Sequence, residues 1–265
     1  MTAPIVTFLS DYGCADEFVG VCHAVIVRRC PDARIIDLGH GVRRHDVRAG
    51  ALALRAALRY APAGVHLAVV DPGVGTARRA VALSTRDGSR LLVGPDNGLL
   101  LPAAGEFGGV AEAVDIGDSQ EALRPISATF HGRDVFAPVA AALADRVPIT
   151  AVGRPIAAAS LVALELPQPR LEDGALHAHV LSLDGFGNVA LDASPTAFAA
   201  AATLVVDVGG AQSAAVMART FADVAPGQLV AYEDSRGCLA LAVNGGSAAV
   251  RLGLEVDAEL VVRAR

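Results

Sequence analysis

Acidic and basic side chains that could act on one ligand lie together in the segment Asp71-Pro72-Gly73-Val74-Gly75-Thr76-Ala77-Arg78-Arg79. This segment follows the apolar run 65–70, which is typical of a strand buried on both faces. Asp71 is then expected at the carboxyl end of that strand, where open α/β sheets bind ligands. Two glycines within three residues leave space for an approaching molecule, while an acid and two guanidinium groups lie within reach of one another. The combination predicts a ligand loop.

Each of these residues also has a structural interpretation. Asp71 could be an ordinary turn acid, the two arginines could lie on a solvated edge, and His131 could be a half-buried imidazole. The pair Gly73-x-Gly75 lacks the third glycine of a dinucleotide loop and the Gly-Lys-Ser/Thr ending of a Walker loop, so phosphate binding has little support.

The elements before the loop alternate between strand and helix patterns. In chain order they are a strand at 5–9, a helix at 18–29 capped by Asp16, a strand at 34–38, a helix that begins at Asp46 and ends before Pro62, and the strand at 65–70. The β-α-β-α-β order predicts a doubly wound, mostly parallel sheet in an α/β unit.

After the loop, the sequence indicates a hairpin around 86–89, a helix at about 99–107 and an Ala-rich helix that Pro148 ends. The pattern changes near 167–169, where short β-type runs begin at close spacing. We therefore expect an N-terminal α/β domain at 1–167 and a C-terminal antiparallel, barrel-like β domain at 168–265. The expected strands of the second domain are 176–183, 204–208, 229–232, 238–243 and 260–263.

Composition restricts the class of partner. The 265 residues are 53% hydrophobic and carry a formal net charge of −6, which favours a packed protein and argues against a general nucleic-acid surface. The four cysteines form no CxxC pair, and no signal-like or membrane-length apolar segment is evident. We expect a cytoplasmic protein without a membrane segment that acts on a small molecule.

Five further motifs accompany the loop. They are Ser10-Asp11-Tyr12-Gly13, Pro95-Asp96-Asn97-Gly98, Phe130-His131-Gly132-Arg133-Asp134, Phe186-Gly187-Asn188 and Ser235-Arg236-Gly237. In this order the chain resembles the S-adenosyl-L-methionine hydroxide adenosyltransferases, which are hydrolases homologous to the fluorinating and chlorinating 5′-halogenases. The resemblance covers both expected domains. It implies a homotrimer with active sites between subunits, and it implies no cofactor besides the substrate itself.

The resemblance also implies a reaction and a catalytic triad. In the family, a nucleophile attacks ribose C5′ of S-adenosylmethionine and releases methionine, and water as nucleophile gives adenosine. The water-activating residues match Asp71, Arg78 and His131 here. An adjacent guanidinium weakens a carboxylate as a base, so we expect Asp71 to position the water and His131 to accept the proton.

The residue types at two of the triad positions distinguish enzymes that use water as the nucleophile from enzymes that use a halide. The fluorinating relatives have Tyr where this chain has Asp71, and Tyr-Ser where it has His131-Gly132. A carboxylate at position 71 repels chloride or fluoride, so the residues favour hydrolysis over 5′-halogenation.

Substrate contacts follow from the same resemblance. Asp11 matches the acid that binds the ribose hydroxyls, and Phe18 replaces a small polar residue near the ribose. The remaining matches are Asp184 for the methionine ammonium, Phe186 and Asn188 for the adenine, Ser235 and Arg236 for the methionine carboxylate, and Asn244 with Gly245 for the adenine edge. Asp96 and Asn97 are expected to be structural turn residues.

Two other functions remain open. A non-catalytic trimeric protein that binds adenosine or S-adenosylmethionine is one, since hydrolysis of this substrate looks wasteful. A metal hydrolase is the other, because His40, His45 with Asp46, and His131 with Asp134 pair imidazole with carboxylate. Their spacings match no metal motif, so we expect no metal.

Overall fold

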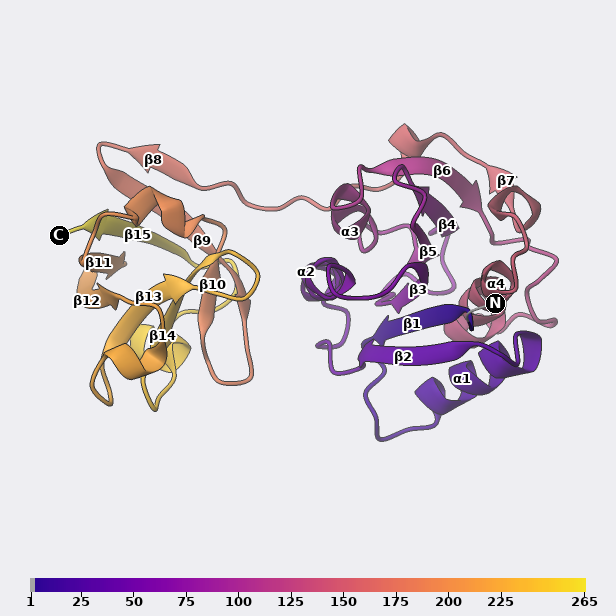
Figure 1. The fold of residues 1–265 in the computed structure, drawn as a ribbon, viewed down its shortest axis with the longest axis horizontal. Coiled ribbons are helices and arrows are strands. Elements are labelled where there is room, and N and C mark those ends of the chain that lie inside the picture. The colour runs from indigo at the N-terminus through magenta and orange to yellow at the C-terminus, as the bar shows by residue number, and fades with distance from the viewer. Residues whose placement is uncertain (1–2) are drawn as a thin grey trace. The chain divides into compact units, whose positions relative to one another are not determined.

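The structure is a computed structural model that describes residues 3–265. The chain forms two compact units, one that extends to Glu165 and one from Leu166 to Arg265 (Figure 1). Each unit has its own sheet and its own buried core.

The first unit is built on a seven-stranded sheet with the order β2-β1-β3-β5-β4-β6-β7. Strands β2, β1, β3 and β5 are parallel neighbours, and β4, β6 and β7 join by antiparallel pairing. This is the mostly parallel sheet that the sequence predicts. The strands are β1 (Ile5–Ser10), β2 (Arg34–Gly39), β3 (Gly64–Val69), β4 (Ala80–Thr85), β5 (Arg90–Pro95), β6 (Val110–Asp115) and β7 (Arg154–Pro155).

Helices cover both faces of this sheet (Figure 1). Leu67 and Val69 of β3 pack in one core cluster with α1 and α4, whereas Ala68 and the following Val70 pack in another with α2 and α3. Alternate side chains of β3 are therefore buried on opposite faces, as its uninterrupted apolar run predicts. The helices are α1 (Phe18–Arg29), α2 (Val47–Leu58), α3 (Leu101–Gly105) and α4 (Ala137–Ala144).

Helix starts agree with the sequence in one case and differ in the other. Asp46 caps α2, since its Oδ1 accepts a hydrogen bond from Ala49 N at 2.9 Å. The expected cap of α1 by Asp16 is wrong, because Glu17 takes the cap position and makes no side-chain bond there. The helix expected at 99–107 is reduced to α3, a single short turn of helix.

The second unit is a closed barrel of seven strands, in which β9 pairs with both β15 and β10. The expected antiparallel pairing holds around this barrel except between β12 and β13, which are parallel. The barrel strands are β9 (Ala175–Leu183), β10 (Val189–Leu191), β11 (Thr203–Val208), β12 (Ala211–Met217), β13 (Leu229–Glu233), β14 (Leu239–Val243) and β15 (Glu259–Ala264). Outside the barrel, β8 (Arg170–Glu172) pairs with β9, and the α-helix of this unit is α5 (Ala248–Leu252).

Two simpler expectations can be compared with the described residues. None of the helices between residues 3 and 265 is long and apolar enough to cross a membrane. Among residues 3–265, Cys14, Cys22, Cys30 and Cys238 form no disulfide with one another.

A buried histidine makes the first unit sensitive to acid. His66 on β3 is fully buried, and its Nδ1 lies 2.9 Å from Thr7 Oγ1. Burial, with a smaller contribution from Arg90, lowers the pKa of His66 to about 3. The folded chain therefore leaves His66 neutral at a pH where the unfolded chain protonates it, so this group removes stability as the pH falls below about 6.5.

We expect His66→Leu to flatten the acid side of the stability curve. Between about pH 6 and pH 4, His66 should contribute a slope of about 1.4 kcal/mol per pH unit to the free energy of unfolding. Urea unfolding of both proteins at several pH values measures this slope, and only the difference between the two curves is attributed to His66. Parallel curves would contradict the assignment.

Candidate active site

A buried ion pair forms the centre of the site. Asp71 follows β3, and Arg78 lies seven residues later in the same loop. Arg78 Nε donates to Asp71 Oδ1 at 3.0 Å, and Arg78 Nη2 donates to Asp71 Oδ2. The Asp71 and Arg78 side chains are only 6% and 8% exposed. Two parallel bonds between a fork-shaped donor and a carboxylate fix both groups in orientation.

His131 reaches this pair from a distant part of the chain. It begins a π-helical turn, Gly132–Phe136, that leads into α4, and its Nδ1 lies 3.2 Å from Arg78 Nη2. Phe136 of the same turn lies under the guanidinium, with Arg78 Cζ 5.4 Å from the ring centroid. The structure therefore brings the three triad residues of the sequence prediction together.

Gly75 has a structural reason in addition to its place in the loop. Gly75 has φ +77°, and a Cβ there would lie 2.5 Å from the carbonyl oxygen of Ala128. Gly75 thus allows the loop of Asp71 to pack directly on the segment that carries His131. Its absent side chain serves contact between two loops of the protein.

The contact with Arg78 also defines the hydrogen-bonding state of His131. A guanidinium only donates, so His131 Nδ1 accepts and the proton of the neutral ring lies on Nε2. Burial, and then the charge of Arg78, lower the pKa of His131 below its usual value. His131 is therefore neutral near pH 7, and it presents an N–H group at Nε2.

An open pocket of about 270 Å³ lies beside this cluster. Its walls come from the ends of β1 and β3, which are parallel neighbours, and from the turns near His45 and His131. Asp71 and His131 are among the lining residues, whereas Arg78 is not, so Arg78 holds the two groups from behind. The lining residues are Asp11, Tyr12, Asp16, Phe18, Arg44, His45, Asp71, Val74, Thr129, His131 and Gly132.

Carboxylates outnumber cationic groups in the lining, and the charge of one of them, Asp71, is balanced by Arg78 behind it. The lining contains three carboxylates, those of Asp11, Asp16 and Asp71, and one guanidinium, that of Arg44. Asp11, expected at the ribose, is held by its Oδ2, which accepts a hydrogen bond from His45 N at 2.8 Å. An acidic lining favours a cationic ligand and disfavours a small anion.

The sequence predicts no contact of Tyr12 or His45 with a substrate. Tyr12 lies in a ring cluster with Phe8, Phe18 and Phe130, and burial raises its pKa well above the usual value. His45 has φ +67°, which is uncommon for a residue with a side chain. The motif Ser10-Asp11-Tyr12-Gly13 was the sequence feature that could have indicated Tyr12. No sequence feature indicates the backbone conformation of His45.

Asp96 and Asn97, in the turn after β5, have structural roles, as expected. Arg79 has a structural role as well, because it binds Asp96. Arg79 Nε donates to Asp96 Oδ2 at 2.9 Å, while Val162 N donates to Asp96 Oδ1 at 2.8 Å. Asn97 Nδ2 donates to the carbonyl of Val70 at 2.8 Å, just before Asp71. These bonds brace both ends of the loop that carries Asp71 and Arg78.

Three of the residues expected to bind substrate share one turn of the second unit, between β9 and β10. Asp184 Oδ1 accepts bonds from Phe186 N and Asn188 N, both at 2.9 Å, and its Oδ2 accepts from Asn188 Nδ2 at 2.8 Å. Asp184 therefore holds its own turn in shape. The Phe186 side chain is 82% exposed, so its ring is available to stack on a partner.

The other expected residues of this unit lie in neighbouring turns. Ser235 and Arg236 connect β13 to β14, and Arg236 Nη1 donates to Ser182 Oγ at 3.2 Å, two residues before Asp184. Asn244 Nδ2 donates to the carbonyl of Val224 at 2.7 Å, and Gly245 has φ +74°. The segment after Gly245 packs against the turn of Asp184, since Ala249 N donates to the Gly187 carbonyl at 3.0 Å.

The His–carboxylate pairs considered from the sequence are used in other ways. Asp46 caps α2, and Asp134 accepts hydrogen bonds from Arg133 and from Ser127 N. Among residues 3–265, neither His45 with Asp46 nor His131 with Asp134 belongs to a group that could hold a metal ion.

A parallel sheet with an Asp–Arg–His cluster at the carboxyl edge of its strands, followed by a closed barrel unit, defines a two-unit enzyme of the α/β class. The chain belongs to the SAM hydroxide adenosyltransferase family. The model of the family's N-terminal domain matches residues 6–153, and that of its C-terminal domain matches residues 178–261.

Individual relatives agree with this membership. An (R)-S-adenosyl-L-methionine hydrolase from Salinispora tropica is 49% identical over 98% of both chains. A solved structure of an uncharacterized conserved protein from Thermotoga maritima has a TM-score of 0.89 at 37% identity, over 97% of this chain and 99% of its own. A fluorinase from Nocardia brasiliensis is more distant, with 30% identity over 98% of this chain and 97% of its own.

Gly132 tests the shape of the pocket. A Cβ at this position would lie 3.0 Å from Tyr12 Cζ and closer still to its hydroxyl oxygen, so Gly132→Ala must push Tyr12 away. We expect activity on S-adenosyl-L-methionine to fall roughly tenfold or more, with a small change in Tm because the end of the Tyr12 side chain can move.

The matched control is Gly20→Ala in α1, where a Cβ meets open space. Tyr12→Phe combined with Gly132→Ala removes the nearest atom and should recover part of the lost activity. Normal activity of the single Gly132→Ala variant would show that Tyr12 does not shape the pocket.

Proposed function

We propose that this chain hydrolyses S-adenosyl-L-methionine at ribose C5′ and gives adenosine and L-methionine. One observation carries the proposal: the pocket is acidic, and Asp71 and His131 face it while the buried Arg78 holds both. The substrate carries a positive sulfonium group at ribose C5′, which suits such a lining. The names of the hydrolases among the relatives support the same reaction.

The reaction is a single displacement. A water oxygen attacks C5′ in line with the C5′–S bond, that bond breaks with its electron pair on sulfur, and methionine leaves as a neutral thioether. The leaving group needs no protonation, so the work of the protein is alignment of the water and removal of its proton. Asp11, fixed by the backbone of His45, is placed to bind the ribose hydroxyls.

The position of His131 bears on where that proton goes. With Nδ1 facing Arg78, the nitrogen left for a pocket water is Nε2, which already carries a proton. Asp71 keeps a free lone pair on each oxygen after its bonds to Arg78. Because the oxygen bound to C5′ becomes a strong acid as the C–S bond breaks, even a guanidinium-paired carboxylate is basic enough to receive its proton. We therefore propose Asp71 as the acceptor and His131 as a donor that orients the water, which reverses the order expected from the sequence.

The remaining features of the proposal come from the family resemblance. The reaction uses no metal and no cofactor, and the protein acts in the cytoplasm as a homotrimer. In the trimer, Asp184, Phe186, Asn188, Ser235, Arg236, Asn244 and Gly245 of one subunit bind the adenine and amino-acid ends of a substrate whose ribose lies in the pocket of a neighbouring subunit. Light scattering tests the trimer.

Halogenation is the alternative within the same fold. The three lining carboxylates argue against it, because their negative charge repels a halide in the pocket. A non-catalytic protein that binds adenosine or S-adenosyl-L-methionine is the alternative in a different class, and the cluster of Asp71, Arg78 and His131 argues against it.

Product analysis decides between these functions. We expect the protein, incubated with S-adenosyl-L-methionine, to form adenosine and methionine in equal amounts at the same rate with and without chloride, and with chelator present. 5′-Chloroadenosine in the chloride sample would indicate a halogenase. The absence of any product from folded, trimeric protein would refute the enzyme proposal.

A further inference from the structure

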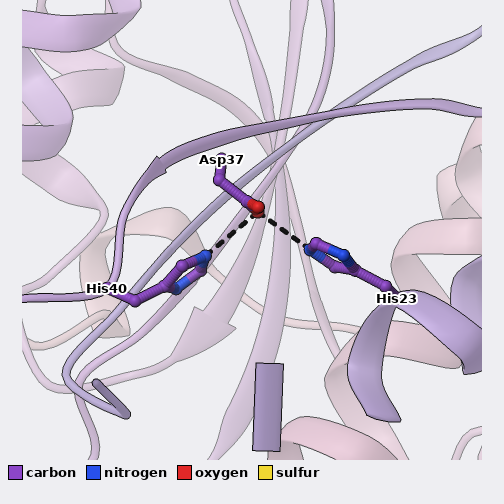
Figure 2. A group of neighbouring side chains, drawn as sticks. All are labelled: His23, Asp37 and His40. Carbon is purple, nitrogen blue, oxygen red and sulfur yellow. Dashed lines mark hydrogen bonds and ion pairs between the residues drawn. The ribbon is translucent and has the colours of Figure 1, made fainter. Parts of the chain in front are cut away.

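Two histidines converge on one carboxylate away from the pocket lining. His23 comes from α1, Asp37 from β2 and His40 from the turn directly after β2 (Figure 2). His23 Nε2 lies 2.8 Å from Asp37 Oδ1, and His40 Nε2 lies 3.0 Å from the same oxygen. One ligand atom from each of the three residues lies within 4.8 Å of the others.

The buried member of this group is already fixed for metal binding. The His40 side chain is 5% exposed, and its Nδ1 lies 2.8 Å from Ser10 Oγ. When Nδ1–H donates to that oxygen, the lone pair of the ring lies on Nε2 and points toward Asp37. Metal-binding histidines are held in this way, with the second ring nitrogen bonded to a fixed acceptor.

The Nε2 atom of His40 has no hydrogen-bond partner among the described residues. It is buried, and although it approaches Asp37 Oδ1, it makes no hydrogen bond there or with any other described residue. A buried nitrogen of this kind costs free energy unless a partner satisfies it. Phe8 packs on both imidazoles, with ring centroids 4.7 Å from His40 and 6.0 Å from His23, so the two rings are held by the core.

The spacing of the atoms suits a metal ion. Two ligand atoms that lie about 2.1 Å from one metal are roughly 3.0 Å apart at a right angle and roughly 3.4 Å apart at the tetrahedral angle. The two measured approaches to Asp37 Oδ1, 2.8 and 3.0 Å, are close to the smaller of these spacings, so a small outward shift of the side chains admits an ion. His23 and Asp37 are 31% and 41% exposed, so an ion can enter from solvent and water can complete its coordination.

We propose that His23, Asp37 and His40 form a binding site for a late first-row divalent metal ion such as Zn²⁺, Co²⁺ or Ni²⁺. Two imidazoles and one carboxylate are donors that suit these ions and leave open positions for water. The ion replaces the proton that His23 and Asp37 share, and it ties α1 to β2. This site takes no part in the proposed hydrolysis, since none of its residues lines the pocket.

The sequence did not reveal this group because its members come from a helix, a strand and a turn. His40 was considered for metal binding only with His45 and His131, which lie elsewhere. The pairing of α1 with β2 through these side chains becomes evident only in the folded unit.

Metal binding to untagged, full-length protein tests the proposal. We expect isothermal titration with Zn²⁺ to give one site per chain, and Co²⁺ to give visible absorption without a sulfur-to-metal band. Asp37→Asn and His23→Ala should each weaken Zn²⁺ binding by roughly tenfold or more, and saturating Zn²⁺ should raise the Tm of the wild type but not of these variants.

Two variants serve as controls. His177→Ala removes a histidine of the second unit, and Cys14→Ser removes an exposed thiol that could bind metal by itself. Both should bind Zn²⁺ as the wild type does. The proposal is refuted if the folded wild type binds no Zn²⁺ at micromolar concentrations, if binding persists in Asp37→Asn and His23→Ala, or if it is lost in Cys14→Ser. Since the readout is binding, it does not depend on the proposed hydrolysis.

Discussion

The buried ion pair between Asp71 and Arg78 is the interaction on which the site depends. Both side chains are almost fully removed from solvent, so each charge needs the other. Removal of one partner from such a pair costs about 3–5 kcal/mol, because an unpaired charge stays buried. The same guanidinium reaches His131 and lies over Phe136, so it connects the loop after β3 to the turn before α4.

Much of the surrounding structure serves to keep this arrangement in place. Asn97 bonds the backbone just before Asp71, and Gly75 permits close packing on Ala128. The parallel pairing of β1 with β3 places Asp11 on the same edge of the sheet as Asp71. Arg78 is thereby a positioning residue, and the groups that face the pocket are the carboxylates and His131.

The sequence predicts those features of the fold and the site that depend on local residue patterns. The apolar run before Asp71 indicates a strand buried on both faces, and Asp46 before a helical pattern indicates a cap; both are confirmed. Parts that depend on contacts between distant residues could not be read in this way. The reason for Gly75, the space that Tyr12 takes beside Gly132 and the convergence of His23 with His40 all arise from tertiary packing.

In the proposed reaction, Asp71 takes the proton from water while His131 orients it. Single-turnover rates of Asp71→Asn and His131→Asn test this claim most directly, with bound substrate measured separately. Asn at position 131 can offer its amide oxygen to Arg78 in place of Nδ1 but cannot accept a proton. We expect Asp71→Asn to lose about a hundredfold or more in rate and His131→Asn to lose much less. A near-normal rate for Asp71→Asn, with no turnover by His131→Asn, would contradict the account and make His131 the base.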